Sequence, residues 1–125
     1  DKDLGPVPGE VYFLKQMKYH PNVIKFLHYQ QLTSEMFVII CERIANCKDL
    51  FDVRKERGGF FTEYETQKYV KTLVDVVRAM EKKNIIHRDI KLENILYDVE
   101  KDDIKLIDFG LATKHKPGKL FTTFW

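Results

Sequence analysis

Two short motifs in the C-terminal half of the sequence carry residue types suited to phosphoryl transfer. Residues 87–94 read His-Arg-Asp-Ile-Lys-Leu-Glu-Asn, and Asp108-Phe109-Gly110 follows fourteen residues after Asn94. Transfer from ATP to a hydroxyl needs a carboxylate that orients and deprotonates the hydroxyl, a cation beside the phosphoryl group, and oxygen ligands for magnesium. Asp89 and Lys91 are candidates for the first two tasks, and Asn94 and Asp108 for the metal ligands.

The first third of the sequence predicts one helix and two strands. Pro8 can begin a helix that runs to about Lys18, with apolar positions three residues apart. His20-Pro21-Asn22 ends that helix, and the apolar runs Val23–Tyr29 and Met36–Glu42 then predict two strands of a hairpin.

The middle of the sequence predicts two more helices. Asp49–Arg57 is expected to be a short helix that ends at Gly58-Gly59, because glycine accepts the left-handed conformation of helix ends. Thr62 and Glu65 have the spacing of a capping box, so a longer amphipathic helix begins there and runs to about Asn84.

Two short strands are expected around the second motif. Ile95–Asp98 and Ile104–Ile107 flank the charged turn Val99–Asp103, which predicts a hairpin. Such a hairpin would place Asn94 and Asp108 at the ends of its two strands. Short motifs are convincing only in the right structural context, and the predicted order of helix, polar loop and hairpin supports a shared function for these two.

Composition excludes several classes of protein. The chain has 125 residues, 44% hydrophobic and 32% charged, with a net charge of +2, so it is expected to be one domain or part of one. Nothing in it calls for a nucleic acid or membrane partner, and the apolar run Met36–Cys41 is too short to span a bilayer. Cys41 and Cys47 complete no zinc or disulfide pattern, which favours an intracellular protein, cytoplasmic or nuclear.

The ordered motifs resemble the catalytic domain of eukaryotic protein kinases, from Glu10 to Trp125. The resemblance implies an α+β, two-lobed fold of which this chain is a fragment. Residues 1–42 would belong to the N-lobe, 43–48 to the hinge, and 49–125 to the C-lobe through the activation loop. The first residue, Asp1, and the last, Trp125, suggest a piece cut from a longer domain.

The same resemblance implies roles for the motif residues. Asp89 would accept the proton of the substrate hydroxyl, and Lys91 would contact the γ-phosphate, a lysine position typical of serine/threonine kinases. Asn94 and Asp108 would bind Mg²⁺, so ATP and Mg²⁺ are the expected cofactors. The alternatives are a loop-capping aspartate, a surface lysine and two turn residues.

Other residues would support the chemistry. Glu10 matches the helix glutamate that pairs with an ATP-positioning lysine, although it could be a plain exposed helix residue. His87 and Phe109 would pack in the hydrophobic spine of the family, with Leu14 and Phe26 as its upper members.

The resemblance also implies regulation by phosphorylation. Arg88 would pair with a phosphorylated activation loop, since guanidinium binds phosphate in a fork geometry. Thr123 is the candidate acceptor, because residues 119–124 are similar to activation segments of the calcium/calmodulin-dependent and AMP-activated kinase group. Trp125 stands where that group has a small residue, so Thr122 is the alternative acceptor.

Within the family, residues 42–52 resemble the hinge of Pim kinases, except that Asn46 replaces a proline. Cys41 would then line the back of the adenine pocket, or be simple strand core, and Asp49 would lie near the ribose. The backbone of four hinge residues would meet the adenine edge: Glu42, Arg43, Ile44 and Ala45.

Two further carboxylates, Asp52 and Glu93, would face arginines of a protein substrate around the target serine or threonine. Solvated charges at helix ends are the alternative interpretation. The oligomeric state stays open.

The kinase-type glycine loop and the Val-Ala-Ile-Lys strand are absent from these 125 residues, so Glu10 has no lysine partner from that strand. The fragment alone is therefore expected to expose apolar surface and to have little or no activity. Two functions remain: part of an active serine/threonine protein kinase, or an inert, truncated binding or regulatory module.

Overall fold

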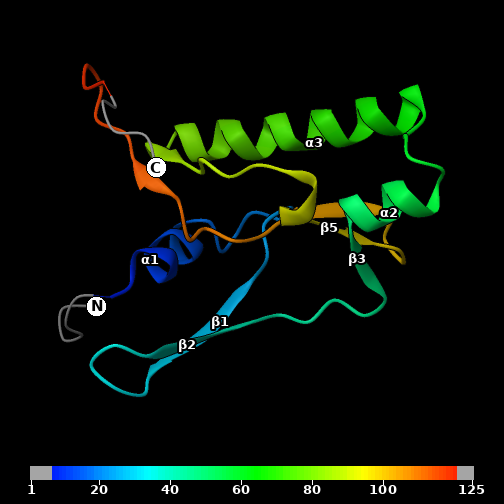
Figure 1. The fold of residues 1–125 in the computed structure, drawn as a ribbon. Coiled ribbons are helices and arrows are strands. Elements are labelled where there is room, and N and C mark those ends of the chain that lie inside the picture. Colours follow the sequence, from blue (N-terminus) through cyan, green and yellow to red (C-terminus); the bar gives the residue numbers. More distant parts are fainter. Residues whose placement is uncertain (1–6, 121–125) are drawn as a thin grey trace.

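The computed structural model describes residues 7–120, a mixture of helices and small antiparallel sheets that agrees with the expected α+β class (Figure 1). No helix among these residues has the length and apolar content needed to cross a bilayer. The elements in chain order are α1 (Gly9–Gln16), β1 (Phe26–Gln31), β2 (Phe37–Cys41), β3 (Cys47–Asp49), α2 (Leu50–Glu56), α3 (Glu63–Glu81), β4 (Ile85–Ile86), the 3-10 helix η1 (Leu92–Asn94), β5 (Ile95–Asp98), β6 (Asp103–Leu106) and β7 (Thr113–Lys114).

The capping box predicted for the long helix is present at the start of α3. Thr62 Oγ1 accepts the N–H of Glu65 at 3.2 Å, and Glu65 Oε2 accepts the N–H of Thr62 at 3.0 Å. Each of the two bonds satisfies a backbone N–H at the start of α3, and together they fix the first turn of the helix. The buried residues Tyr69, Val76 and Met80 lie seven and four residues apart, so one face of α3 packs inward.

Helix α2 begins and ends as the sequence predicts. The side chain of Asp49 accepts the N–H of Asp52 at 2.9 Å, the usual N-cap bond. Gly58 and Gly59 have φ values of +86° and +98°, a region in which other residues are strained. The chain can therefore leave α2 and enter α3 within a few residues.

Both predicted hairpins form, with corrected boundaries. β1 pairs with β2, and β5 pairs with β6, antiparallel in each case. β3 adds to the edge of β5, and β4 pairs with β7. These three short strands were not predicted, because two or three residues are too few to show a periodic pattern.

The first predicted strand, Val23–Tyr29, is wrong at its start. Strand β1 begins at Phe26, whereas Val23 makes an isolated parallel bridge to Leu106 in β6. Ile24 N–H donates to Leu106 O at 3.0 Å. Val23 and Ile24 are buried in the core beside β6. They are extended and apolar like strand residues, and periodicity in the sequence cannot tell which sheet an extended segment joins.

Two other boundaries shift slightly. Helix α1 ends at Gln16 rather than Lys18, because the last residues form a turn in which Lys18 N–H donates to Lys15 O at 3.4 Å. Strand β6 ends at Leu106. Ile107 N–H still donates to Asn94 O at 2.9 Å in register with the ladder, but Asn94 N–H donates to Lys91 O at 3.0 Å in η1 and leaves that pair incomplete.

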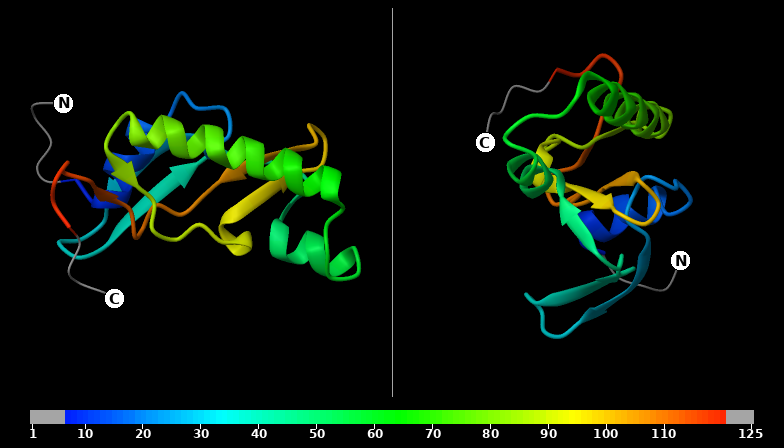
Figure 2. Two further views of the ribbon diagram at one scale, coloured as in Figure 1. Left: turned by 90° about the horizontal axis from the view of Figure 1, so that it is seen from above. Right: turned by 90° about the vertical axis from the view of Figure 1, so that its right-hand side faces the viewer.

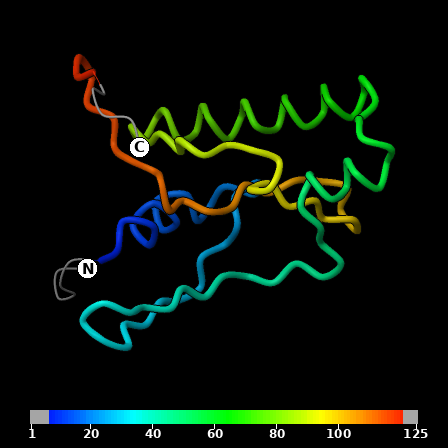
Figure 3. The backbone as a smooth tube through the Cα atoms, in the orientation of Figure 1, coloured from blue at the N-terminus to red at the C-terminus, as the bar shows by residue number. Residues whose placement is uncertain are grey.

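One buried cluster joins α1, α3 and the β5–β6 hairpin, and Figure 3 shows the chain between residues 84 and 94 passing under α3 to reach it. The β1–β2 hairpin projects away from this cluster (Figure 2). The expected apolar exposure is found on and beside β2, at Met36, Phe37, Val38 and Ile40, which are 56%, 40%, 42% and 45% exposed.

Candidate catalytic site

The polar loop between β4 and β5 folds so that its two ends meet. Asn94 Nδ2 donates to the backbone oxygen of Asp89 and to Asp89 Oδ2, both at 2.9 Å. Asn94 is 6% exposed, so this amide is held in place. Because its nitrogen is bonded to Asp89, the side-chain oxygen of Asn94 is the atom left for a cation.

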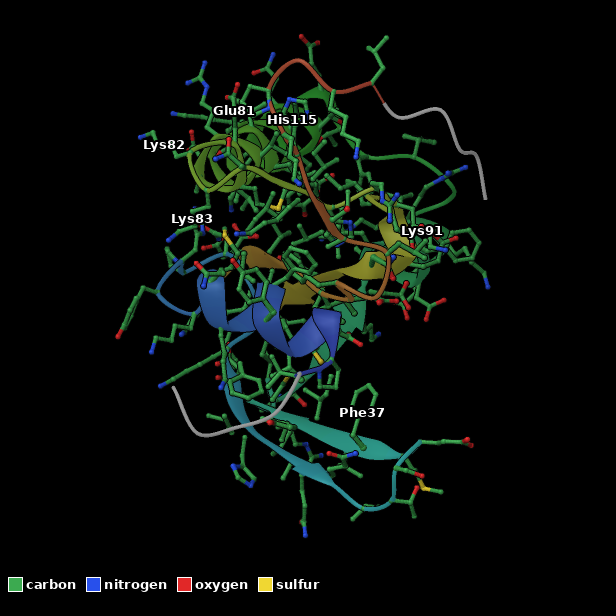
Figure 4. All side chains as sticks on the ribbon, turned by 90° about the vertical axis from the view of Figure 1, so that its left-hand side faces the viewer. Phe37, Glu81, Lys82, Lys83, Lys91 and His115 are labelled. Carbon is green, nitrogen blue, oxygen red and sulfur yellow. The ribbon has the colours of Figure 1, made fainter. Side chains whose placement is uncertain are left out.

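Lys91 lies on the same loop with its ammonium near the carboxylate of Asp89. Its Nζ is 3.6 Å from Asp89 Oδ1, and its side chain is 53% exposed. Figure 4 labels Lys91, which comes from the stretch just before η1. A half-exposed ammonium at this distance can reach a phosphoryl group without losing contact with the aspartate.

His87 anchors the start of this loop to the second motif. Asp89 N–H donates to His87 Nδ1 at 3.1 Å, so Nε2 carries the hydrogen and donates to Ile107 O at 3.1 Å. Burial lowers the pKa of His87, outweighing the backbone bond to Ile107. A neutral imidazole therefore links the backbone of Asp89 to the residue before Asp108.

The ring of Phe109 completes this anchor. It is fully buried and meets the His87 ring edge to face, with centroids 4.9 Å apart. Leu14 belongs to the same buried cluster, and Phe26 packs against it while partly exposed. The four predicted spine residues therefore share one apolar core.

Asp108 and Arg88 both have left-handed backbones, with φ values of +59° and +68°. Positive φ values are uncommon for residues other than glycine, although aspartate accepts them more readily than arginine, and such conformations cluster at functional sites. Gly110 N–H donates to Asp108 Oδ1 at 3.1 Å, and Arg88 Nε donates to Leu111 O at 2.6 Å. Two hydrogen bonds thus hold the segment that follows β6 in this conformation.

Glu10 reaches the second motif from α1. Burial, and next the charge of Asp108, raise the pKa of Glu10, while a hydrogen bond from the backbone of Phe109 opposes the rise. A Cβ atom added to Gly110 would lie 3.1 Å from Asp108 Oδ1 and 3.9 Å from Glu10 Oε2. Glu10 is therefore beside the Asp-Phe-Gly motif rather than on an outer helix face.

The predicted hinge residues line a polar crevice of about 190 Å³ that also involves Lys105. Arg43, Ile44 and Ala45 contribute to it, and the Glu42 side chain points toward Lys105. Cys41 is partly buried at the end of β2, and its pKa is raised by burial and then by the charges of Glu10 and Glu42. The adenine contacts expected of these residues stay a prediction.

The predicted acidic residues lie at the end of β3, in α2 and in η1, elements that contact one another. Asp49 caps α2, so its carboxylate has a structural task besides any contact with ribose. Asp52 and Glu93 are exposed, and their role toward a substrate stays a prediction. Thr122 and Thr123 lie outside the described residues.

The oxygen donors fit magnesium better than a cation with many protein ligands. The backbone oxygen of Asn94 accepts Ile107 N–H at 2.9 Å, so Asn94 lies opposite the residue that precedes Asp108. Within residues 7–120, no three His, Cys, Asp or Glu side chains gather into a metal site. Mg²⁺ takes one or two protein ligands together with phosphate oxygens, so this pair is suited to it.

A family model described as protein kinase domain matches residues 1–125. The chain belongs to the protein kinase family. Its match covers the full sequence, so the partial two-lobed fold expected from the motifs is confirmed.

Several known serine/threonine kinases are similar to this protein kinase segment. Serine/threonine-protein kinase pim-2 of Danio rerio is 33% identical over 98% of the chain, which spans 41% of that relative. Calcium-dependent protein kinase 11 of Arabidopsis thaliana is 37% identical over 94% of the chain, and calcium-dependent protein kinase 5 of Plasmodium berghei is 38% identical over 84%. The chain spans 24% and 18% of these two relatives.

Sequence reasoning missed two polar residues that hold this kinase segment together. Asn22 Nδ2 donates to Ile104 O at 2.9 Å, and Lys105 Nζ contacts Glu42 Oε1 at 2.5 Å. Asn22 was used only as a helix breaker. A lysine between the apolar Ile104 and Leu106 of β6 was the available signal, because a charge in such a position usually has a partner.

Proposed function

We propose that this chain is the catalytic-loop part of an ATP-dependent serine/threonine protein kinase. The observation that supports this most is the pair of bonds from Asn94 Nδ2 to Asp89, which joins a candidate base to a candidate metal ligand. Lys91 adds a cation 3.6 Å from the same carboxylate. These three groups meet the requirements of phosphoryl transfer to a hydroxyl.

In this proposal Asp89 orients the substrate hydroxyl and accepts its proton. The amide of Asn94 holds Asp89 Oδ2, so Oδ1 is the oxygen that faces the hydroxyl and Lys91. Lys91 stabilises negative charge on the transferred phosphoryl group. Asn94 and Asp108 would hold Mg²⁺, which supplies neutralisation of the ATP phosphates.

The proposed substrate is a protein with basic residues near its target serine or threonine. Asp52 and Glu93 are exposed on neighbouring elements and would attract arginine side chains. An intracellular location, cytoplasmic or nuclear, goes with this substrate class.

The test is transfer of labelled phosphate from ATP to an arginine-rich serine peptide by the full-length protein with Mg²⁺. Asp89→Asn is expected to lower kcat about 100-fold or more, since general base catalysis contributes about 10²–10⁴-fold. Asp75→Asn, at an exposed position of α3, is the matched control and should keep full activity. Turnover that survives Asp89→Asn would contradict the proposal.

A second function has one observation in its favour. Glu10 lies near Asp108 in a partly buried position with a raised pKa, and no lysine or arginine within residues 7–120 pairs with it. Without a lysine that pairs with Glu10 and positions ATP, the protein would be an inert binding or regulatory module. Binding of Mg²⁺ and a non-hydrolysable ATP analogue with no turnover by the full-length protein would favour that function.

A further inference from the structure

Six exposed basic side chains gather where the end of α3 meets the segment that follows β7. Three come from residues 78–83 and three from residues 114–119. Glu81 is the one carboxylate in these two stretches, so six cations and one anion give them a net charge of +5, whereas the whole chain carries +2. The six cations, called the basic surface below, are Arg78, Lys82, Lys83, Lys114, Lys116 and Lys119.

Backbone pairing brings the two stretches together, although they are far apart in the sequence. β4 pairs antiparallel with β7, and Ile85 lies opposite Lys114. His115 N–H donates to Asn84 O at 2.8 Å, which continues the contact toward the end of α3. Figure 4 labels Lys82 and His115 at this same end of the molecule. The two stretches therefore form one surface.

A tight turn places two of the lysines beside each other. Lys119 N–H donates to Lys116 O at 3.0 Å, and Gly118, which follows Pro117, has a φ of +82°. Proline at the second position and a glycine with positive φ at the third are typical of a type II turn. The first and last Cα atoms of such a turn lie within about 7 Å, so these two lysines leave the backbone from neighbouring points.

The cations of the basic surface are not neutralised by ion pairs with other residues in the range 7–120. Lys114 Nζ lies 5.1 Å from the centroid of the Tyr12 ring in α1, a contact that holds the side chain and keeps its charge. Cations at the end of α3 also suit the helix dipole, but that effect does not account for the three lysines of residues 114–119. Like charges gathered in this way attract an anionic partner.

We propose that the basic surface binds an acidic segment of a partner protein, a short run of aspartates and glutamates. Five of its six cations are lysines, whereas arginine is the residue whose fork suits phosphate groups. Neither stretch contains a Phe, Tyr or Trp on which the bases of a single-stranded nucleic acid would stack. Outside the two stretches the chain has a net charge of −3, which disfavours a long polyanion.

The basic surface lies at the end of α3 opposite to α2, as Figure 1 shows. A partner bound there leaves Asp52 of α2 open to the arginines of a substrate. The inference thus goes beyond the proposed function, and its test does not depend on turnover.

The test is the fluorescence anisotropy of a labelled peptide of consecutive glutamates, titrated with the full-length protein. Binding should saturate and should weaken about tenfold when the salt concentration rises from about 0.05 M to about 0.3 M, because salt screens exposed charges. A peptide of glutamines with the same length should not bind. Binding of both peptides with equal affinity, or of neither, would overturn the proposal.

Two double variants test the two stretches separately. Lys82→Gln combined with Lys83→Gln should weaken binding about threefold to tenfold, since an exposed ion pair contributes up to about fivefold in affinity. Lys116→Gln combined with Lys119→Gln should weaken binding by a similar factor. An effect confined to one of the two variants would refute a single surface made by both stretches.

Lys25→Gln combined with Lys55→Gln is the matched control. Both lysines are exposed and lie outside the basic surface, and the variant loses the same two charges. Its affinity for the glutamate peptide should stay within about twofold of the parent protein. Equal weakening by this control would show attraction to net charge alone and would overturn the proposal.

Other anionic partners are outcomes of the same experiment. A labelled single-stranded oligonucleotide with the formal charge of the glutamate peptide represents nucleic acid, and vesicles that contain phosphatidylserine represent a membrane surface. Tighter binding of either would overturn the proposal. Failure of peptide binding leaves the proposed function intact, and a protein without turnover leaves the binding result intact.

Discussion

Asn94 holds Asp89 through its side-chain amide, with Nδ2 2.9 Å from Asp89 Oδ2. The bond joins the two ends of the polar loop and orients the amide of Asn94, whose oxygen is the atom that can bind a metal ion. It also means that the proposed base and metal ligand form one unit, so changing either should alter the other.

Asn94→Ala should therefore cost both activity and stability. The backbone and carboxylate of Asp89 would lose a donor in a buried position, a loss of about 1–3 kcal/mol in the free energy of unfolding. Urea unfolding of the chain measures this, and turnover by the full-length protein should fall in parallel. Gln67→Ala, at an exposed position of α3, is the control and should change neither quantity.

Phe109→Ala should be strongly destabilising. The ring is fully buried against His87, and removing a buried aromatic ring costs about 3–5 kcal/mol. Denaturant unfolding gives the free energy, and Phe109→Leu should lose clearly less because it fills most of the cavity. A loss below about 1 kcal/mol for the alanine variant would mean that the ring is not packed as described.

Acid should loosen the site through His87. Its pKa is lowered in the folded state, so its contribution to stability is present above the ordinary value of 6.5 and is lost as pH falls through the folded pKa. Protonation would place a hydrogen on Nδ1, which accepts Asp89 N–H. Unfolding free energy measured from pH about 8 to about 5 should decline in the parent chain and less in His87→Gln, with His28→Gln, at an exposed position of β1, as control.

Glu10→Gln should stabilise the isolated chain at neutral pH. The pKa of Glu10 is raised in the folded state, so its contribution to stability is full below its ordinary value of 4.5 and is lost as pH rises through the folded pKa. A neutral amide removes that penalty and keeps an oxygen for the Phe109 N–H. The gain should vanish in acid. A loss of stability at neutral pH would show that the charge is satisfied by the fold.

The same substitution should abolish turnover by the full-length protein if Glu10 pairs with a lysine there. Stability and activity would then change in opposite directions, which a general packing defect does not produce. An active Glu10→Gln enzyme would exclude Glu10 from nucleotide positioning.

Local signals in the sequence predicted most of the helices and the hairpins. Thr62 with Glu65 and Asp49 with Asp52 are capping pairs formed by neighbours, so their spacing is visible without tertiary contacts. The Asp89–Asn94 contact is also local, five residues apart. Its geometry is therefore largely determined by one loop.

The parts that sequence reasoning missed depend on distant partners. The sequence pattern predicts Val23 as an ordinary residue of the first hairpin, but its backbone forms a parallel bridge with Leu106 in β6. Lys105 stands out as a charge between two apolar residues, but no local pattern identifies Glu42 as its partner, since the two lie 63 positions apart. The short strands β4 and β7 exist only because residues 85–86 and 113–114 meet, and Figure 4 shows His115 beside Glu81 at that end of α3.

The bond between Asn22 and Ile104 has a consequence for the order of folding. It closes a loop of 82 residues, whereas the hairpin β5–β6 and the capped helices close loops of a few residues. Closing a long loop costs entropy before any contact compensates it, so local elements form first. During synthesis, the segment after α1 must therefore wait for β6 before it can reach its final position.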